Sequence, residues 1–240
     1  TPSQTATNTP SNTTTQTQTP TQTQTQTPTP TQVGIPVPGS PNLVAWYNIP
    51  AGPNDWTPSS PVNGSLIGNW NDTSASIYGI HNMGADGGNS AKPTYTTNVQ
   101  NGIPMLLFNG TSNKMSATSF GSIANQGAIA LFIISKFNNT TSPQTIMTNA
   151  ARGMNLSISG TTSRYQIGMA GGVGEDSGST VDTSAHLHTI LFNGSATGNA
   201  NRLIYRRDGI QKTLDFKATT VGTATSASTI LYMGETSTGT

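Results

Sequence analysis

From Asn42 onward, short apolar runs alternate with stretches rich in Gly, Asn, Ser and Pro. No window of about eleven residues or more keeps the period of an amphipathic helix, and brief apolar runs bounded by such residues are typical of β-strands. The sequence therefore predicts an all-β fold, with strands over residues 43–49, 65–70, 103–108, 128–137, 145–148, 154–159, 164–169, 186–192, 202–206, 212–216 and 229–233.

Two features of the sequence also predict how strands are arranged. Residues 128–137 (AIALFIISKF) are apolar on both faces, which is expected of a central strand buried between two layers. The Asp208-Gly209 pair lies between two strand-like runs and favours a tight primed turn, so residues 202–216 are predicted to form a hairpin. Many short strands with almost no helix indicate a sandwich or barrel, and we expect an antiparallel β-sandwich.

The first 32 residues have a different composition, with 15 Thr, 7 Gln, 5 Pro and no charged side chain. Such a segment buries too little apolar surface to offset its ordering entropy, so residues 1–32 are predicted to be an extended stalk or tail, of a kind that is often O-glycosylated. Residues 33–41 form a Pro/Gly hinge, and residues 42–240 form the sandwich. In a second interpretation, residues 13–27, which nearly alternate Thr and Gln, add as a strand to a sheet edge of another subunit.

Charge and cysteine content exclude several classes of function. Only 8% of the residues are charged, the net charge is +1, and the chain has no cysteine. We therefore expect no nucleic-acid partner, and the lack of an apolar run of about 18 residues predicts no membrane insertion. No initiator Met and no signal peptide are visible, so we expect a processed N-terminus or an excerpt of a longer chain.

A series of sequence blocks follows one another in a recognisable order. The blocks are LVAWY at 43–47, WNDTS at 70–74, KPTY at 92–95, NGIP at 101–104, FNGTSN at 108–113, AIALFIISKF at 128–137, HLHTILF at 186–192, LIY at 203–205 with Asp208-Gly209, and LYMG at 231–234. Together they resemble the laminin-G-like branch of the concanavalin A-like lectin/glucanase superfamily. The resemblance implies a jelly-roll sandwich. It also implies a final strand that is not found after Gly234, so we expect either a fragment or a strand supplied by another segment.

Catalysis is not expected from this set of residues. Glycosidases of the superfamily use the pattern Glu-x-Asp-x-x-Glu on one strand, and the sequence lacks that pattern. Glu175 and Asp176 are adjacent and follow the glycine-rich residues 171–174, which predicts a solvated acidic turn. A glycoside hydrolase is therefore only a remote alternative.

Metal binding has little support in the sequence. Related lectins hold calcium at a rim loop, and residues 83–90 offer only Asp86 and Asn89 where calcium takes about six to eight oxygens. No cofactor is expected, and these two residues are the tentative ligands if calcium binds. His186 and His188 are two positions apart and share a predicted strand face, where we interpret them as structural residues rather than half of a metal site.

Sugar binding and glycosylation have candidate residues. Trp56, beside Asp55 in a polar loop, is the best platform for stacking on a sugar ring, with Tyr95 as a further candidate, whereas Trp46 and Trp70 are predicted to be core. Sequons for N-glycosylation are about as frequent as the composition gives by chance. They begin at Asn12, Asn63, Asn71, Asn109, Asn138, Asn139, Asn155 and Asn193.

The low charge and the Thr/Pro/Gln tract are typical of proteins displayed outside cells, and they resemble tracts in virus, phage and adhesin proteins. The sequence thus predicts a non-catalytic structural module, such as a fibre, capsid or appendage subunit, located extracellularly, on a cell surface or on a virion surface. Its expected partners are copies of itself or other subunits. The alternative is a carbohydrate-binding adhesin or receptor-binding module, whose partners would be glycans.

Overall fold

The computed structural model describes residues 42–49, 56–74, 81–140, 143–149, 153–217 and 219–234. These residues contain sixteen strands. All of these residues lie within one unit, Pro36–Thr240. The predicted stalk (1–32) and hinge (33–41) lie outside the described residues, as do Asn12 and Asp55.

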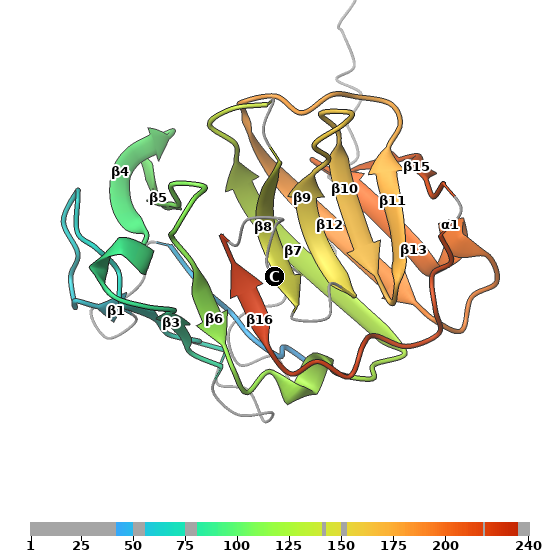
Figure 1. Ribbon diagram of the computed structural model, residues 1–240, viewed down its shortest axis with the longest axis horizontal. Helices are drawn as coiled ribbons and strands as arrows, with labels where there is room; N and C mark the ends of the chain where they lie inside the picture. Colours follow the sequence, from blue (N-terminus) through green and yellow to red (C-terminus); the bar gives the residue numbers. More distant parts are fainter. Residues whose placement is uncertain are drawn as a thin grey trace, which may run out of the picture. The chain divides into compact units, whose positions relative to one another are not determined.

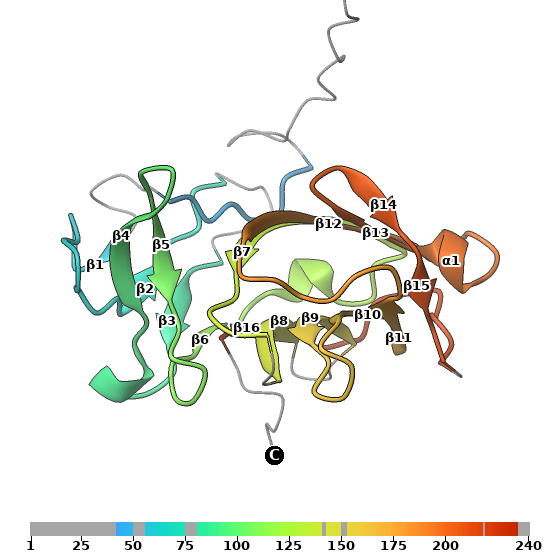
Figure 2. The same ribbon diagram turned by 90° about the horizontal axis from the view of Figure 1, so that it is seen from above.

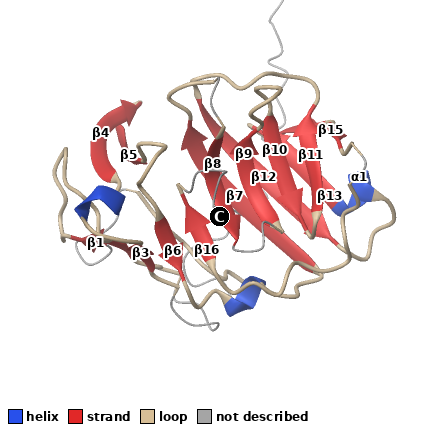
Figure 3. Ribbon diagram, in the orientation of Figure 1, coloured by secondary structure: helices blue, strands red, loops and turns tan. Residues whose placement is uncertain are grey.

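The strands form an all-β antiparallel sandwich, as predicted (Figures 1 and 3). The larger sheet has ten strands in the order β1 (Trp56–Thr57), β2 (Asn69–Trp70), β3 (Met83–Ala85), β6 (Met115–Ala117), β16 (Leu231–Met233), β8 (Gln144–Asn149), β9 (Met154–Ile158), β10 (Tyr165–Met169), β11 (Gly172–Asp176) and β15 (Leu214–Asp215). The smaller sheet has the order β14 (Ile210–Lys212), β13 (Leu203–Arg207), β12 (Ala185–Asn193) and β7 (Ala128–Lys136).

A separate hairpin and three short helices complete the described elements. The hairpin pairs β4 (Thr94–Gln100) with β5 (Ile103–Leu107), and the helices are η1 (Asn89–Ala91), η2 (Gly121–Ile123) and α1 (Asn199–Arg202). Figure 2 shows β7, β12, β13 and β14 in one layer, with β8 to β11 of the larger sheet in the layer that faces it.

The core lies between these two layers and follows the two-residue period of the strands. On β12, Ile190 and Phe192 are buried, whereas the intervening Leu191 is only half-buried. The facing strands supply fully buried side chains such as Leu156 of β9 and Ile167 of β10. Burial of each such side chain stabilises the fold by about 1.5–3 kcal/mol before entropy is counted.

The structure overturns the prediction that residues 128–137 form a central strand buried on both faces. β7 is the edge strand of the smaller sheet, and among the described residues it pairs only with β12. Its side chains alternate between exposed and half-buried, with Phe132 50% and Ile134 70% exposed. The apolar composition of a strand does not reveal how many layers cover it.

The predicted acidic turn at Glu175 and Asp176 is also wrong. Both residues belong to β11, where they are buried, with Asp176 fully so. Gly172 and Gly174 are strand residues, whereas Gly171 lies in the turn before β11 with φ of 80°. A Cβ at Gly172 would lie 2.6 Å from the Val221 Cα. Glycine is therefore required at position 172 because another backbone segment approaches closely there, and not because of a turn.

The predicted hairpin at 202–216 is confirmed over its first part. β13 pairs with β14, and Asp208 and Gly209 both have positive φ, at 53° and 79°, as a primed turn requires. The second part differs, because β15 leaves the hairpin and pairs with β11 in the larger sheet.

Residues 43–49, predicted as the opening strand, are not in a strand but are held by the segment that follows β2. The backbone N–H of Trp46 donates to Asp72 Oδ1 at 2.9 Å, and its C=O accepts from the Thr73 N–H at 2.9 Å. The same carboxylate accepts from the backbone N–H groups of Ser74 and His81. Trp46 is only half-buried rather than core, whereas Trp70 is core as predicted.

Candidate functional site

The predicted sugar-binding residues are not brought together by described contacts. The backbone of Trp56 lies in β1 opposite Trp70, and its side chain is outside the description, as is Asp55. Tyr95 lies in β4, where it is half-buried and packs against the hydrophobic core. Only part of the Tyr95 ring is therefore available to a ligand.

The tentative calcium ligands are each engaged by a lysine. Asp86 Oδ2 forms an ion pair with Lys114 Nζ at 2.9 Å, and Asn89 Oδ1 accepts a hydrogen bond from Lys92 Nζ at 2.9 Å. Each of these two oxygens already contacts a lysine ammonium group. In the described residues there is also no group of three or more His, Cys, Asp or Glu side chains arranged to hold a metal ion.

The sequons differ in how accessible their asparagines are. Asn63, Asn109, Asn138, Asn139 and Asn193 are exposed, and Asn71 is half-buried. Asn109 also has a structural role, because its Oδ1 accepts hydrogen bonds from the backbone N–H groups of Thr111, Ser112 and Asn113.

Asn155, also half-buried, differs from the other sequons. Its Oδ1 is buried in β9 without a hydrogen-bond partner in the described chain. The same atom lies 2.4 Å from where a Cβ at Gly168 would be. A glycan on Asn155 would therefore need this part of the sheet to open.

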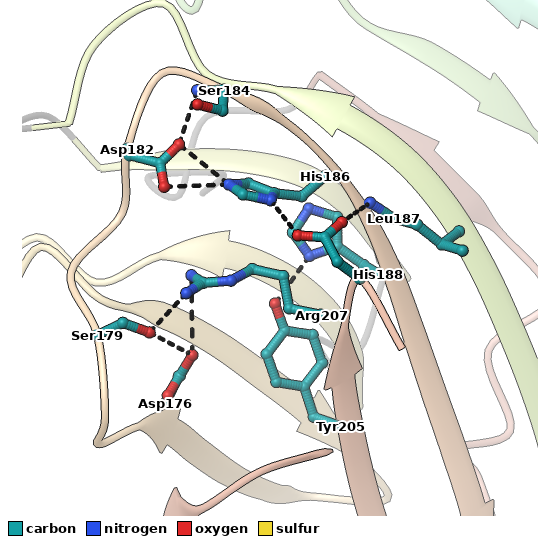
Figure 4. Close-up of polar contacts among 10 residues, drawn as sticks. Asp176, Ser179, Asp182, Ser184, His186, Leu187, His188, Tyr205 and Arg207 are labelled. Atoms are coloured by element: carbon teal, nitrogen blue, oxygen red, sulfur yellow. Dashed lines mark hydrogen bonds and ion pairs between the residues drawn. The ribbon is translucent and has the colours of Figure 1, made fainter. Parts of the chain in front are cut away.

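A dense polar network occupies one end of the space between the sheets (Figure 4). At its centre His186 of β12 lies between two carboxylates: Nδ1 is 2.6 Å from Asp208 Oδ2, and Nε2 is 3.0 Å from Asp182 Oδ1. Asp208 also accepts the backbone N–H of Leu187 at 3.0 Å. We call this set the His186 network, with Asp176, Ser179, Ser184, His188, Tyr205 and Arg207 as its other members.

The deeper part of the network is buried. His188 is fully buried, and its Nδ1 is 2.8 Å from the Tyr205 hydroxyl, while the ring of Tyr205 stacks beside it. Arg207 donates from Nη2 to Ser179 Oγ at 2.7 Å, and its Nη1 is 3.8 Å from Asp176 Oδ2. Ser179 in turn donates to Asp176, so the β13 arginine reaches the carboxylate of β11 both directly and through a hydroxyl.

Burial and charge set the protonation states in this network. Burial, with a smaller electrostatic influence of His186 and Arg207, lowers the pKa of His188 to about 3, so its ring is neutral near pH 7. Partial burial opposes ionisation of Asp182 and Asp208. Hydrogen bonds from backbone N–H groups and from His186 outweigh that effect and hold the pKa of each carboxyl below its usual range.

The arrangement joins structural elements. Both ring nitrogens of His186 contact carboxylates. Asp182 lies in the segment between β11 and β12, and Asp208 lies in the turn between β13 and β14. His186 therefore ties the loop to the hairpin turn.

Sequence analysis found only part of this network. The spacing of His186 and His188 correctly predicted that they share a strand face, and their ring centroids are 6.2 Å apart. The contributions of Asp176, Asp182 and Arg207 were missed. Asp176 and Arg207 are 31 residues apart and lie on different sheets, and the sequence carries no signal for that pairing. Asp182 is only four residues from His186, but it precedes the strand, and such a spacing does not by itself predict a contact.

A second feature lies on the outer face of the smaller sheet. Phe132 and Ile134 of β7 are exposed, and Leu187 of β12, which is directly opposite Ile134, is 38% exposed. Ala130 is exposed and lies opposite the half-buried Leu191. We call these five residues the apolar outer patch.

The inner face of β7 is also incompletely covered. Ile129, Leu131 and Ile133 pack against the core but are only half-buried, whereas the inward residues of β12 are buried. Ser135, at the end of the same inner row, has a buried hydroxyl without a partner in the described part of the chain. The sandwich is therefore less closed at β7 than at β12 and β13.

Comparison with known proteins gives no relative for this chain. No family model matches the sequence, no curated protein matches it, and no solved structure matches the fold. Among the described residues, no helix is long and apolar enough to span a membrane.

Proposed function

We propose that this chain is a non-catalytic structural module of an extracellular or virion-surface assembly, such as a fibre, capsid or appendage subunit. Its sandwich is proposed to be of the laminin-G-like, concanavalin A-like kind, on the strength of the ordered sequence blocks. Its proposed partners are copies of itself or other subunits. The observation that carries the assembly role is the apolar outer patch beside an edge of β7 that pairs with no other described strand.

The patch supports this role because folded proteins seldom leave large apolar side chains together at a sheet edge. Such edges are normally protected by charges, prolines or bulges, and exposed apolar patches mark interaction sites. β7 has Lys136 at one end as its sole charge, and it pairs with β12 without a break in register. The low charge of the chain also removes much of the repulsion that keeps proteins apart.

The His186 network supports a non-catalytic role. Its ionisable groups contact one another across the two sheets, and the deepest of them, His188 and Asp176, are fully buried. Groups used in this way stabilise a fold and are not presented to a substrate.

Sedimentation velocity of the full chain over a range of concentrations tests the proposal. We expect the sedimentation coefficient to rise with concentration. Ile134→Lys should weaken this association, while Ile210→Lys should not, because Ile210 is 64% exposed on the opposite edge strand, β14. A chain that sediments as a monomer throughout would overturn the assembly role.

The carbohydrate-binding alternative predicts a different set of results. The chain would then stay monomeric and bind defined glycans on an array, and Trp56→Ala would remove that binding without lowering the melting temperature. That outcome would replace the structural module with an adhesin or receptor-binding module.

A further inference from the structure

We propose that His186 is a pH switch: its doubly protonated ring holds residues 182–184 against the turn between β13 and β14, and loss of one ring proton releases them. This inference goes beyond the assembly role and does not depend on it, because every group involved lies within one chain. It begins from a ring whose two nitrogens both contact carboxylates.

The protonation state of the ring follows from the hydrogen bonds that it makes. Nδ1 is 2.6 Å from Asp208 Oδ2, and Nε2 is 3.0 Å from Asp182 Oδ1. An ionised carboxylate can only accept a hydrogen bond, and a neutral imidazole carries only one N–H group. Both carboxyls have a pKa below their usual range, so both are ionised where histidine side chains titrate. The two contacts together therefore require the imidazolium form.

The other groups around His186 do not replace the charge that it loses. They are His188 on the same strand, Tyr165 on β10, Arg207 on β13 and Asp176 on β11, with the uncharged Ser135 opposite on β7. His188 is neutral near pH 7, and burial raises the pKa of Tyr165 to about 12. The remaining cation, Arg207, is itself 3.8 Å from the Asp176 carboxylate. A neutral His186 ring thus turns a lone pair toward one of its two carboxylates.

The two contacts differ in how firmly the carboxylate is held. Asp208 is fixed to β12, because its Oδ1 accepts the backbone N–H of Leu187 at 3.0 Å and its own N–H donates to the Leu187 C=O at 2.9 Å. Asp182 is exposed, and apart from His186 it accepts a hydrogen bond from the backbone N–H of Ser184 in its own segment, at 2.7 Å. The last ring proton therefore stays on Nδ1, facing Asp208, and the contact with Asp182 opens.

The opening is confined to a short segment. Ser177 donates its backbone N–H to the Thr213 C=O, and Val181, which is buried, donates its own to the Ser163 C=O, so residues 177–181 stay in place. Residues 182–184 are exposed, and their hydrogen bonds to other described elements run from Asp182 to His186. Figure 4 shows Asp182 on one side of the His186 ring and Leu187 on the other. The sandwich thus remains folded when the switch opens.

Site-directed spin labelling tests the switch, because the chain has no cysteine of its own. A nitroxide is attached to the full chain through Thr183→Cys and, as the control, through Gln211→Cys on the exposed side of β14. Spectra are recorded at low protein concentration from about pH 5 to about pH 9, which spans the ordinary range of histidine. We expect the ratio of mobile to immobile label at position 183 to rise about threefold to tenfold with pH, and the label at position 211 to stay unchanged.

Two variants assign the effect to the proposed contact. With His186→Gln the mobility at position 183 should no longer depend on pH, because the titrating ring is gone. Asp182→Asn should give the same result, since its amide can donate to the neutral ring or accept from the charged one. It lies on the surface and replaces His186→Gln if that variant does not fold.

Each of the other outcomes overturns the proposal. These are a label at position 183 with the same spectrum at both ends of the range, a rise that position 211 shares, and a rise that persists in the variants. Greater mobility at low pH would overturn it as well. That result would follow from protonation of the buried His188, which weakens the fold in acid and so acts in the opposite direction.

Discussion

Two neighbouring strands of the smaller sheet, β12 and β7, are similarly apolar but are buried to different degrees. On β12, His188, Ile190 and Phe192 point inward and are buried. On β7, which pairs with β12 along its whole length, Ile133 and its inward neighbours are only half-buried. We call the region of β12 and the His186 network, which the larger sheet covers, the closed end; at the edge, β7 has no second neighbouring strand among the described residues.

This difference shows that the burial of a strand's side chains depends more on the neighbouring elements than on the strand's own composition. β7 is the more uniformly apolar of the two, yet β12, with two histidines, is the better buried. Most polar groups at the closed end are buried with specific partners, whereas β7 has a strand beside it on one side only in the described chain.

The largest expected effect is at the closed end. Asp176→Ala should lower the free energy of unfolding by about 3–5 kcal/mol, because it leaves Arg207 buried without its carboxylate. Urea unfolding measures this. Asp86→Ala is the control, since the exposed Asp86–Lys114 pair should contribute less than about 1 kcal/mol. A loss below about 1 kcal/mol for Asp176→Ala would show that the network does not hold the two sheets together.

A matched pair of isoleucines tests the difference in closure directly. Ile190→Ala should destabilise the protein by about 2–5 kcal/mol, because the side chain is fully buried. Ile133→Ala, on the adjacent strand and the same face, should cost about half as much since the residue is half-buried. Chemical unfolding of both variants gives the comparison. Equal losses would mean that the edge is as well packed as the centre.

Acid should weaken the closed end through His188. Its pKa is about 3 in the folded protein and about 6.5 when unfolded, so the unfolded chain binds the extra proton first. Stability is therefore complete above about pH 6.5 and falls by about 1.4 kcal/mol per unit as the pH drops toward 3. Urea unfolding at several pH values across this range measures the effect. The free energy of unfolding should depend less steeply on pH in the His188→Gln variant. An unchanged slope in that variant would assign the acid sensitivity to other groups.

The smallest expected effect is at the edge. Ile134→Lys should change the free energy of unfolding by less than about 0.5 kcal/mol, because the side chain is 70% exposed in the single chain. Thermal unfolding at low protein concentration measures it. A marked destabilisation would mean that Ile134 is covered within the chain and is not available to a partner.

The sequence predicted the fold class and most of the central strands, because their runs have strong local signals. The turn at Asp208 and Gly209 is set by positive φ at two adjacent positions, which sequence can reveal. β11 was missed because Gly172 and Gly174 are required by contacts with Val221 and Leu214, which are 49 and 40 positions away. The edge position of β7 and the partners of Arg207 likewise depend on contacts between distant segments, which one sequence does not show.

The place of β16 has a consequence for how the chain folds as it is made. β16 comes last in the described chain, yet it lies in the interior of the larger sheet between β6 and β8. During synthesis, β6 and β8 leave the ribosome long before Leu231–Met233 and must wait with unpaired edges. We therefore expect this part of the sheet to be completed late, and a nascent chain that has not yet reached β16 to expose two strand edges that chaperones can bind.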